Sequence, residues 1–111
     1  MNNELKKLLK KTRNKSGLLL GKKSLCSLLS LIYGYIECMT ERDGIYPEFK
    51  PDFQTFIEKQ YNLRDDNDYL SGFFRHWTDI ISFFSVDEGE AYDTFYELLD
   101  EYLINKGEPP L

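Results

Sequence analysis

Histidine is the side chain most often used for general acid–base catalysis near neutral pH, and this chain has one, His76. Asp79 follows three residues later, so on a helix its carboxylate could pair with the imidazole. No serine or cysteine in the sequence has an evident base partner that would activate it as a nucleophile. A histidine at the border of an apolar helix face is more often structural or exposed than catalytic. We therefore predict that the protein is not an enzyme.

The acidic and glycine-rich segments do not complete a metal or nucleotide motif. The run from Asp65 to Asp68 resembles part of a calcium loop, but the glycine and the terminal glutamate of that motif are missing at the required spacing. The segment from Gly17 to Gly21 is not a phosphate-binding loop, because Gly-Lys-Ser/Thr does not follow at the right gap. We therefore expect no cofactor and no metal ion.

The strongest functional candidate is a set of carboxylates on a predicted C-terminal helix. At about 100° per residue, they fall within an arc of roughly 100°, and no lysine or arginine lies on residues 87–105. Two interpretations remain open: a solvated face, and a docking face for a basic partner protein. The predicted docking residues are Asp87, Glu90, Asp93, Glu97, Asp100 and Glu101, and a predicted second patch consists of Asp65, Asp66 and Asp68.

Charge is segregated along the chain. Residues 1–23 hold eight lysines and arginines and one acid, so their net charge is +7; against −5 for the whole chain, residues 24–111 carry −12. Such segregation indicates partners of opposite charge, or docking of one end of the chain on the other. The basic segment lacks aromatic residues that stack on bases, which argues against nucleic acid as a partner.

Apolar periodicity predicts five helices, and no segment alternates at the period of a strand. Four lie at about 3–13, 24–42, 53–61 and 69–84, and the last runs from a capping box at 85–88 to Gly107. Asn3, Ser24 and Asp52 are the predicted caps of the first three helices. Residues 16–21 read as a tight turn or a short extended piece. We predict an all-α fold in which residues 1–111 form a single domain.

The predicted core consists of the aromatic faces of the second, fourth and fifth helices. Phe83 lies off the main apolar stripe of the fourth helix, and we expect it to be buried against another helix; the alternative is an exposed contact patch. No apolar run is long enough to cross a membrane. Cys26 and Cys38 lie about 18 Å apart along one predicted helix, too far for a disulfide. Free thiols are typical of a reducing cytoplasm, where we place the protein.

The sequence resembles a group of small bacterial proteins. The segment Thr12 to Leu25 and the later Tyr33-Gly34-Tyr35 are similar to their opening, an Arg-Pro-Gly-Met-Tyr-Leu-Gly-type stretch, then Ser-Leu, then a helix that ends in Gly-Tyr. The similarity continues through 53–61, 77–84 and 91–102. It departs at Ser16, where the group has proline, and at 18–19, where the group has Met-Tyr.

Some members of this group resemble immunity proteins of polymorphic toxin systems. The resemblance implies a non-enzymatic protein that binds and neutralises a cognate bacterial toxin, and the acidic residues above are the surface we expect it to use. The alternative from a different class is a structural or regulatory interaction module, including a homodimer that uses Phe83 and its neighbours.

Overall fold

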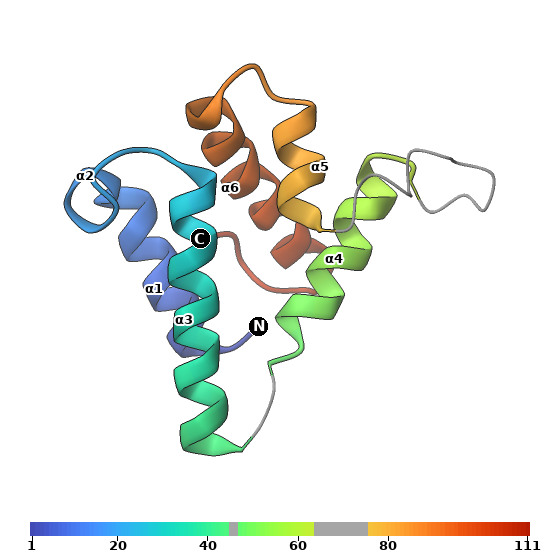
Figure 1. Ribbon diagram of the computed structural model, residues 1–111. Coiled ribbons are helices and arrows are strands. Elements are labelled where there is room, and N and C mark those ends of the chain that lie inside the picture. Colours follow the sequence, from blue (N-terminus) through green and yellow to red (C-terminus); the bar gives the residue numbers. More distant parts are fainter. Residues whose placement is uncertain (45–46, 64–75) are drawn as a thin grey trace.

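The computed structural model describes residues 1–44, 47–63 and 76–111, and within these ranges the chain is helical and contains no strand (Figure 1). This confirms the predicted all-α fold. Each predicted helix is found, although residues 69–75 of the fourth lie outside the described residues. The helices are α1 (Asn3–Asn14), α2 (Ser16–Leu19), α3 (Leu25–Asp43), α4 (Phe49–Gln60), α5 (Trp77–Phe83) and α6 (Glu88–Asn105).

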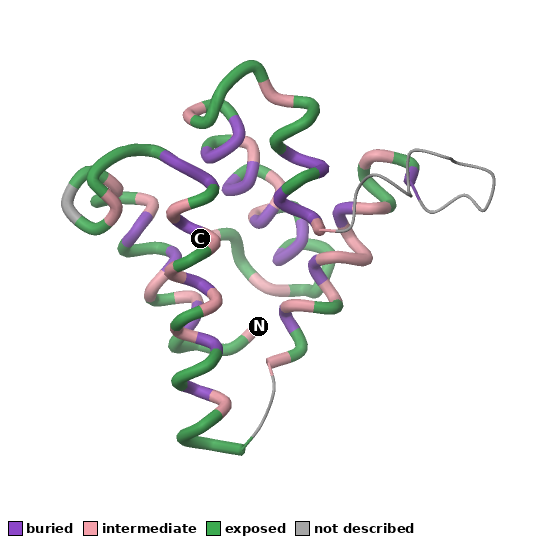
Figure 2. The backbone as a smooth tube through the Cα atoms, viewed as in Figure 1, coloured by how far each residue is buried: buried purple, intermediate pink, exposed green. Residues whose placement is uncertain are grey.

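Helix α6 holds the arrangement together. It packs against α3, α4 and α5, while α1 lies beside α3. In Figure 1, α1 and α3 stand on one side of α6 and α4 stands on the other. The buried positions of every long helix face this common interior, and the outward positions are exposed (Figure 2). Burial of one apolar stripe per helix is what the sequence periodicity requires.

The core is built mainly from aromatic rings. Phe53 of α4 is 0 % exposed and has five neighbouring rings at centroid distances of 5.0 to 6.0 Å. Most of these pairs meet edge to face, the geometry that aromatic quadrupoles favour. The predicted core of α3, α5 and α6 was therefore incomplete, because α4 supplies its central ring. The five neighbours are Phe49, Phe56, Trp77, Phe95 and Tyr102.

Two helix starts follow the predicted type of cap, but only one uses the predicted residue. Ser24 caps α3, where its hydroxyl accepts the backbone N–H of Ser27 at 3.2 Å. Helix α1 is capped by Asn2 rather than Asn3, since Asn2 Oδ1 accepts from the backbone N–H of Glu4 at 2.8 Å. Each cap satisfies a donor that the first turn of a helix leaves without a partner.

Two other predicted caps were wrong. The N-cap of α6 is Asp87, whose Oδ1 accepts from the Glu90 N–H at 2.8 Å; Ser85 donates instead to the Ile81 carbonyl at 2.7 Å. Asp52 does not cap α4, because α4 already begins at Phe49. Residues 16–19, expected as a turn or an extended piece, form the single helical turn α2.

Two glycines of α3 play different roles. Gly44 ends the helix in the left-handed conformation, at φ 69°, and its N–H donates to the Thr40 carbonyl at 2.7 Å. Gly34 is exposed in mid-helix, and a Cβ added there would meet no atom within 4 Å. Within the three described ranges, every helix is too short or too polar to cross a lipid bilayer.

Candidate binding surface

The predicted acidic residues of α6 separate into three groups. Asp87 caps the helix. Asp93 and Asp100 each form an ion pair with a base of residues 1–23, and the remaining three carboxylates form none among the described residues. Glu90, Glu97 and Glu101 are exposed, and within the described residues their carboxylates form no ion pair. We call these three residues the exposed acidic stripe.

The inner side of the acidic face is covered by bases from elsewhere in the chain. Arg13, near the end of α1, pairs with Asp100 at 2.9 Å, and Lys23, just before α3, pairs with Asp93 at 3.3 Å. The Arg13 guanidinium also lies 5.2 Å from the centre of the Tyr96 ring. Of the two interpretations of the segregated charge, the structure shows docking of the basic end of the chain on the acidic helix.

The Lys23–Asp93 ion pair contributes little to stability. The Lys23 and Asp93 side chains are 55 % and 56 % exposed, so solvent screens their attraction. Two buried hydrogen bonds between α6 and α1 contribute more to stability. Tyr92 donates its hydroxyl proton to the Thr12 carbonyl at 3.0 Å, and Tyr96 donates to the Leu9 carbonyl at 2.8 Å.

The exposed acidic stripe runs from Glu90 to Glu101, a distance of about 16 Å along the helix axis. Ile104 follows Glu101 by three residues and is 57 % exposed, so an apolar side chain lies at one end of the stripe. The predicted second acidic patch, Asp65, Asp66 and Asp68, lies outside the described residues.

Phe83 is 63 % exposed, so its expected burial was wrong. Helix α5 ends at Phe83, and its buried side is already occupied by Trp77, Ile80 and Ile81. Phe84 and Val86 are also exposed, at 49 % and 86 %. The sequence signal for this patch was the position of Phe83 off the apolar stripe of its helix.

His76 is the N-cap of α5 rather than a residue within that helix. Its Nδ1 accepts the backbone N–H of Thr78 at 3.1 Å, and its Nε2 hydrogen-bonds the Tyr33 hydroxyl. Half-burial of the imidazole holds the pKa of His76 below its usual value; the Lys50 charge adds to this, and the Asp79 carboxylate opposes it. Since both ring nitrogens bind other groups, the imidazole acts as a structural cap.

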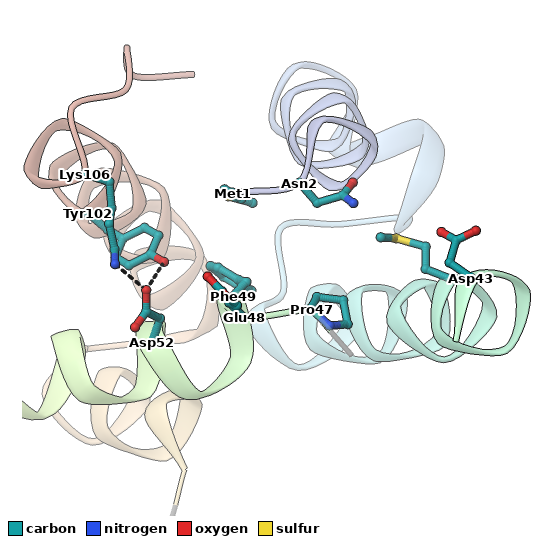
Figure 3. Close-up of a pocket in the computed structure, with 10 residues that line it drawn as sticks. Met1, Asn2, Asp43, Pro47, Glu48, Phe49, Asp52, Tyr102 and Lys106 are labelled. Atoms are coloured by element: carbon teal, nitrogen blue, oxygen red, sulfur yellow. Dashed lines mark hydrogen bonds and ion pairs between the residues drawn. The ribbon is translucent and has the colours of Figure 1, made fainter. Parts of the chain in front are cut away.

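A hollow of about 380 Å³ lies between the ends of α1, α3, α4 and α6 (Figure 3). Asp52 lines one side, where it accepts the Tyr102 hydroxyl proton at 3.1 Å and pairs with Lys106 at 2.5 Å. The Lys106 ammonium, through this hydrogen bond, holds the pKa of the Asp52 carboxyl below its usual range. The Asp52 carboxylate is thus committed to joining α4 to α6. Among the described residues, no three His, Cys, Asp or Glu side chains are placed to hold a metal ion.

Comparison with known proteins gives no relative: no family model, no curated protein and no solved structure matches this chain. The resemblance to immunity-type proteins therefore stays a prediction.

Proposed function

We propose that this protein is a non-enzymatic, immunity-type inhibitor that binds a basic bacterial toxin through the exposed acidic stripe of α6. One observation carries the proposal: basic residues of the same chain cover one side of the acidic face and leave Glu90, Glu97 and Glu101 exposed. Helix α6 already binds a basic segment, α1, along its inner side.

The carboxylates of the exposed acidic stripe bring no benefit to the helix that bears them. Glu97 and Glu101 are four residues apart, a spacing at which like charges destabilise a helix by about 0.2–0.5 kcal/mol. Glu101 also lies near the C-terminal end of α6, where the helix dipole disfavours negative charge. A basic partner would relieve both effects. A row of negative charge also speeds encounter with such a partner by electrostatic steering.

The test is co-expression, in a bacterial host, with secreted toxin candidates encoded beside this gene. We expect protection from one of them, and a complex between the two purified proteins. The absence of both protection and a complex with every such candidate would refute the proposal.

The role of the stripe is tested by charge reversal. The Glu97→Lys/Glu101→Lys double variant should slow association at low salt, with little change in dissociation. The matched control is Glu37→Lys/Glu41→Lys, which reverses two exposed acids at the same spacing on α3 and changes the net charge equally. Equal slowing by both variants would mean that net charge, rather than the stripe, governs association.

A further inference from the structure

The connection between α5 and α6 exposes three large apolar side chains within four residues. Phe83, Phe84 and Val86 are 63 %, 49 % and 86 % exposed. Figure 1 places this connection at the top of the molecule, at the outer end of both helices. Single exposed apolar residues are common on proteins, but contiguous ones mark contact surfaces. We call Phe83, Phe84 and Val86 the apolar corner.

The apolar corner is held in a defined shape. The Phe84 ring stacks on Tyr61 at a centroid distance of 5.0 Å, and Phe83 meets Phe84 edge to face at 5.1 Å. Ser85, between the exposed residues, donates to the Ile81 carbonyl. Asp87 then caps α6. Because the backbone of the apolar corner is fixed at both ends, little conformational entropy would be lost there when a partner binds.

The charged residues next to the apolar corner along the described chain are all negative. Asp79 precedes it, and Asp87, Glu88 and Glu90 follow it, all exposed. No lysine or arginine occurs from residue 76 to residue 105. An apolar centre with a charged rim is the usual composition of a protein interface. A second copy of this chain would bring the same acidic rim to a two-fold contact, where like charges repel.

We propose that the apolar corner is the anchor by which this protein holds a basic partner, whose complementary surface is an apolar pocket rimmed by lysine or arginine. This inference rests on the proposed function and divides the work between two surfaces. The exposed acidic stripe governs the rate of encounter. The apolar corner governs the lifetime of the complex, since buried apolar anchors act mainly on dissociation.

The probe is a 14-residue amphipathic helical peptide of leucine and lysine, compared with a lysine-only peptide of equal charge. In a titration of the ¹⁵N-labelled protein near physiological salt, the Leu/Lys peptide should shift backbone amides of residues 83–90. The Phe83→Ser/Val86→Ser variant should bind it about tenfold more weakly or worse. Leu19→Ser removes an exposed apolar residue on α2 and should change affinity less than about twofold. Val86→Ser, at the most exposed position, repeats the test without risk to folding.

Three results would overturn the anchor. One is that the Leu/Lys peptide shifts mainly backbone amides outside residues 83–90. Another is equal affinity for the variant and the parent protein. The third is a dimer in light scattering at micromolar concentration that Phe83→Ser dissolves.

Failure of the anchor and failure of the proposed function look different. If the Phe83→Ser/Val86→Ser variant still neutralises a toxin, and its complex with that toxin is as long-lived as that of the parent protein, the anchor is refuted and the proposed function stands. If the peptide binds at the apolar corner but the protein neutralises none of the candidate toxins, the proposed function is refuted and the anchor stands.

Discussion

Two tyrosines of α6 join it to α1, and their hydroxyls should contribute unequally to stability. Tyr92 donates to the Thr12 carbonyl and Tyr96 to the Leu9 carbonyl, both in buried surroundings. Leu9 lies within α1, so its carbonyl also accepts a helical N–H from four residues ahead. Thr12 lies in the last turn, where carbonyls lack helical donors, and no backbone N–H of the described residues bonds to it.

The magnitudes follow from that difference. Tyr96→Phe keeps the ring and removes one net hydrogen bond, a loss of about 0.5–1.5 kcal/mol. Tyr92→Phe in addition leaves a buried carbonyl without a partner, so its cost rises to about 1–3 kcal/mol. Tyr92→Phe should therefore be the more destabilising of two chemically identical substitutions.

Urea unfolding followed by circular dichroism measures the loss of stability in each of the two variants. With a slope of about 2 kcal/mol per molar urea, a difference of about 1 kcal/mol separates the midpoints by roughly 0.5 M. The slopes should be unchanged, because neither variant alters the surface exposed on unfolding. A Tyr96→Phe variant that loses as much stability as Tyr92→Phe, or more, would refute the reasoning from helix position.

Three further predictions concern other contacts. His76→Asn keeps a capping side chain but removes a titrating one. Since the pKa of His76 in the folded protein lies below its ordinary 6.5, the parent protein should lose stability as the pH falls through about 6.5. Thermal melts at pH 7.5 and pH 5 should show a smaller loss of stability for the variant than for the parent. Equal losses for the two proteins would contradict this. Gly44→Ala should destabilise by about 1 kcal/mol and Gly34→Ala should stabilise by about 0.5–1 kcal/mol in urea unfolding, so shifts of equal sign would refute the glycine assignments. Arg13→Ala should cost at most about 1 kcal/mol, and less in 1 M salt; a salt-independent loss would point to the Tyr96 ring contact instead.

The sequence predicted the longer helices, but it predicted neither their ends nor the single helical turn α2. Apolar spacing along α3 and α6 is regular enough to define both. Capping residues, by contrast, occur in clusters: Asn2 stands beside Asn3, and Asp87 stands two residues after Ser85. Local rules do not choose among such neighbours, and helix ends are uncertain by one or two residues. Asp52 shows the stronger limit, since its partner Lys106 lies on the far end of α6.

The sequence predicts which carboxylates of the candidate surface share one side of α6, but not which of them contact other parts of the chain. Spacing alone places Asp93, Glu97 and Asp100 on one side of a helix. Which of them pair with bases depends on where the N-terminal segment docks, and that is set by tertiary packing around Tyr92 and Tyr96. The same limit explains Phe83, whose exposure depends on whether another helix covers it.

The pairing of α1 with α6 also has a kinetic consequence. During synthesis, α1 emerges first and α6 last among the described helices, about ninety residues later. At roughly 5–20 residues per second, the apolar side of α1, with Leu5 and Leu9, waits for about 5–20 s without its final partner. The two helices are also far apart in sequence, so their contact is among the least local in the fold. The nascent chain is thus exposed to aggregation, and to chaperones, until α6 is made.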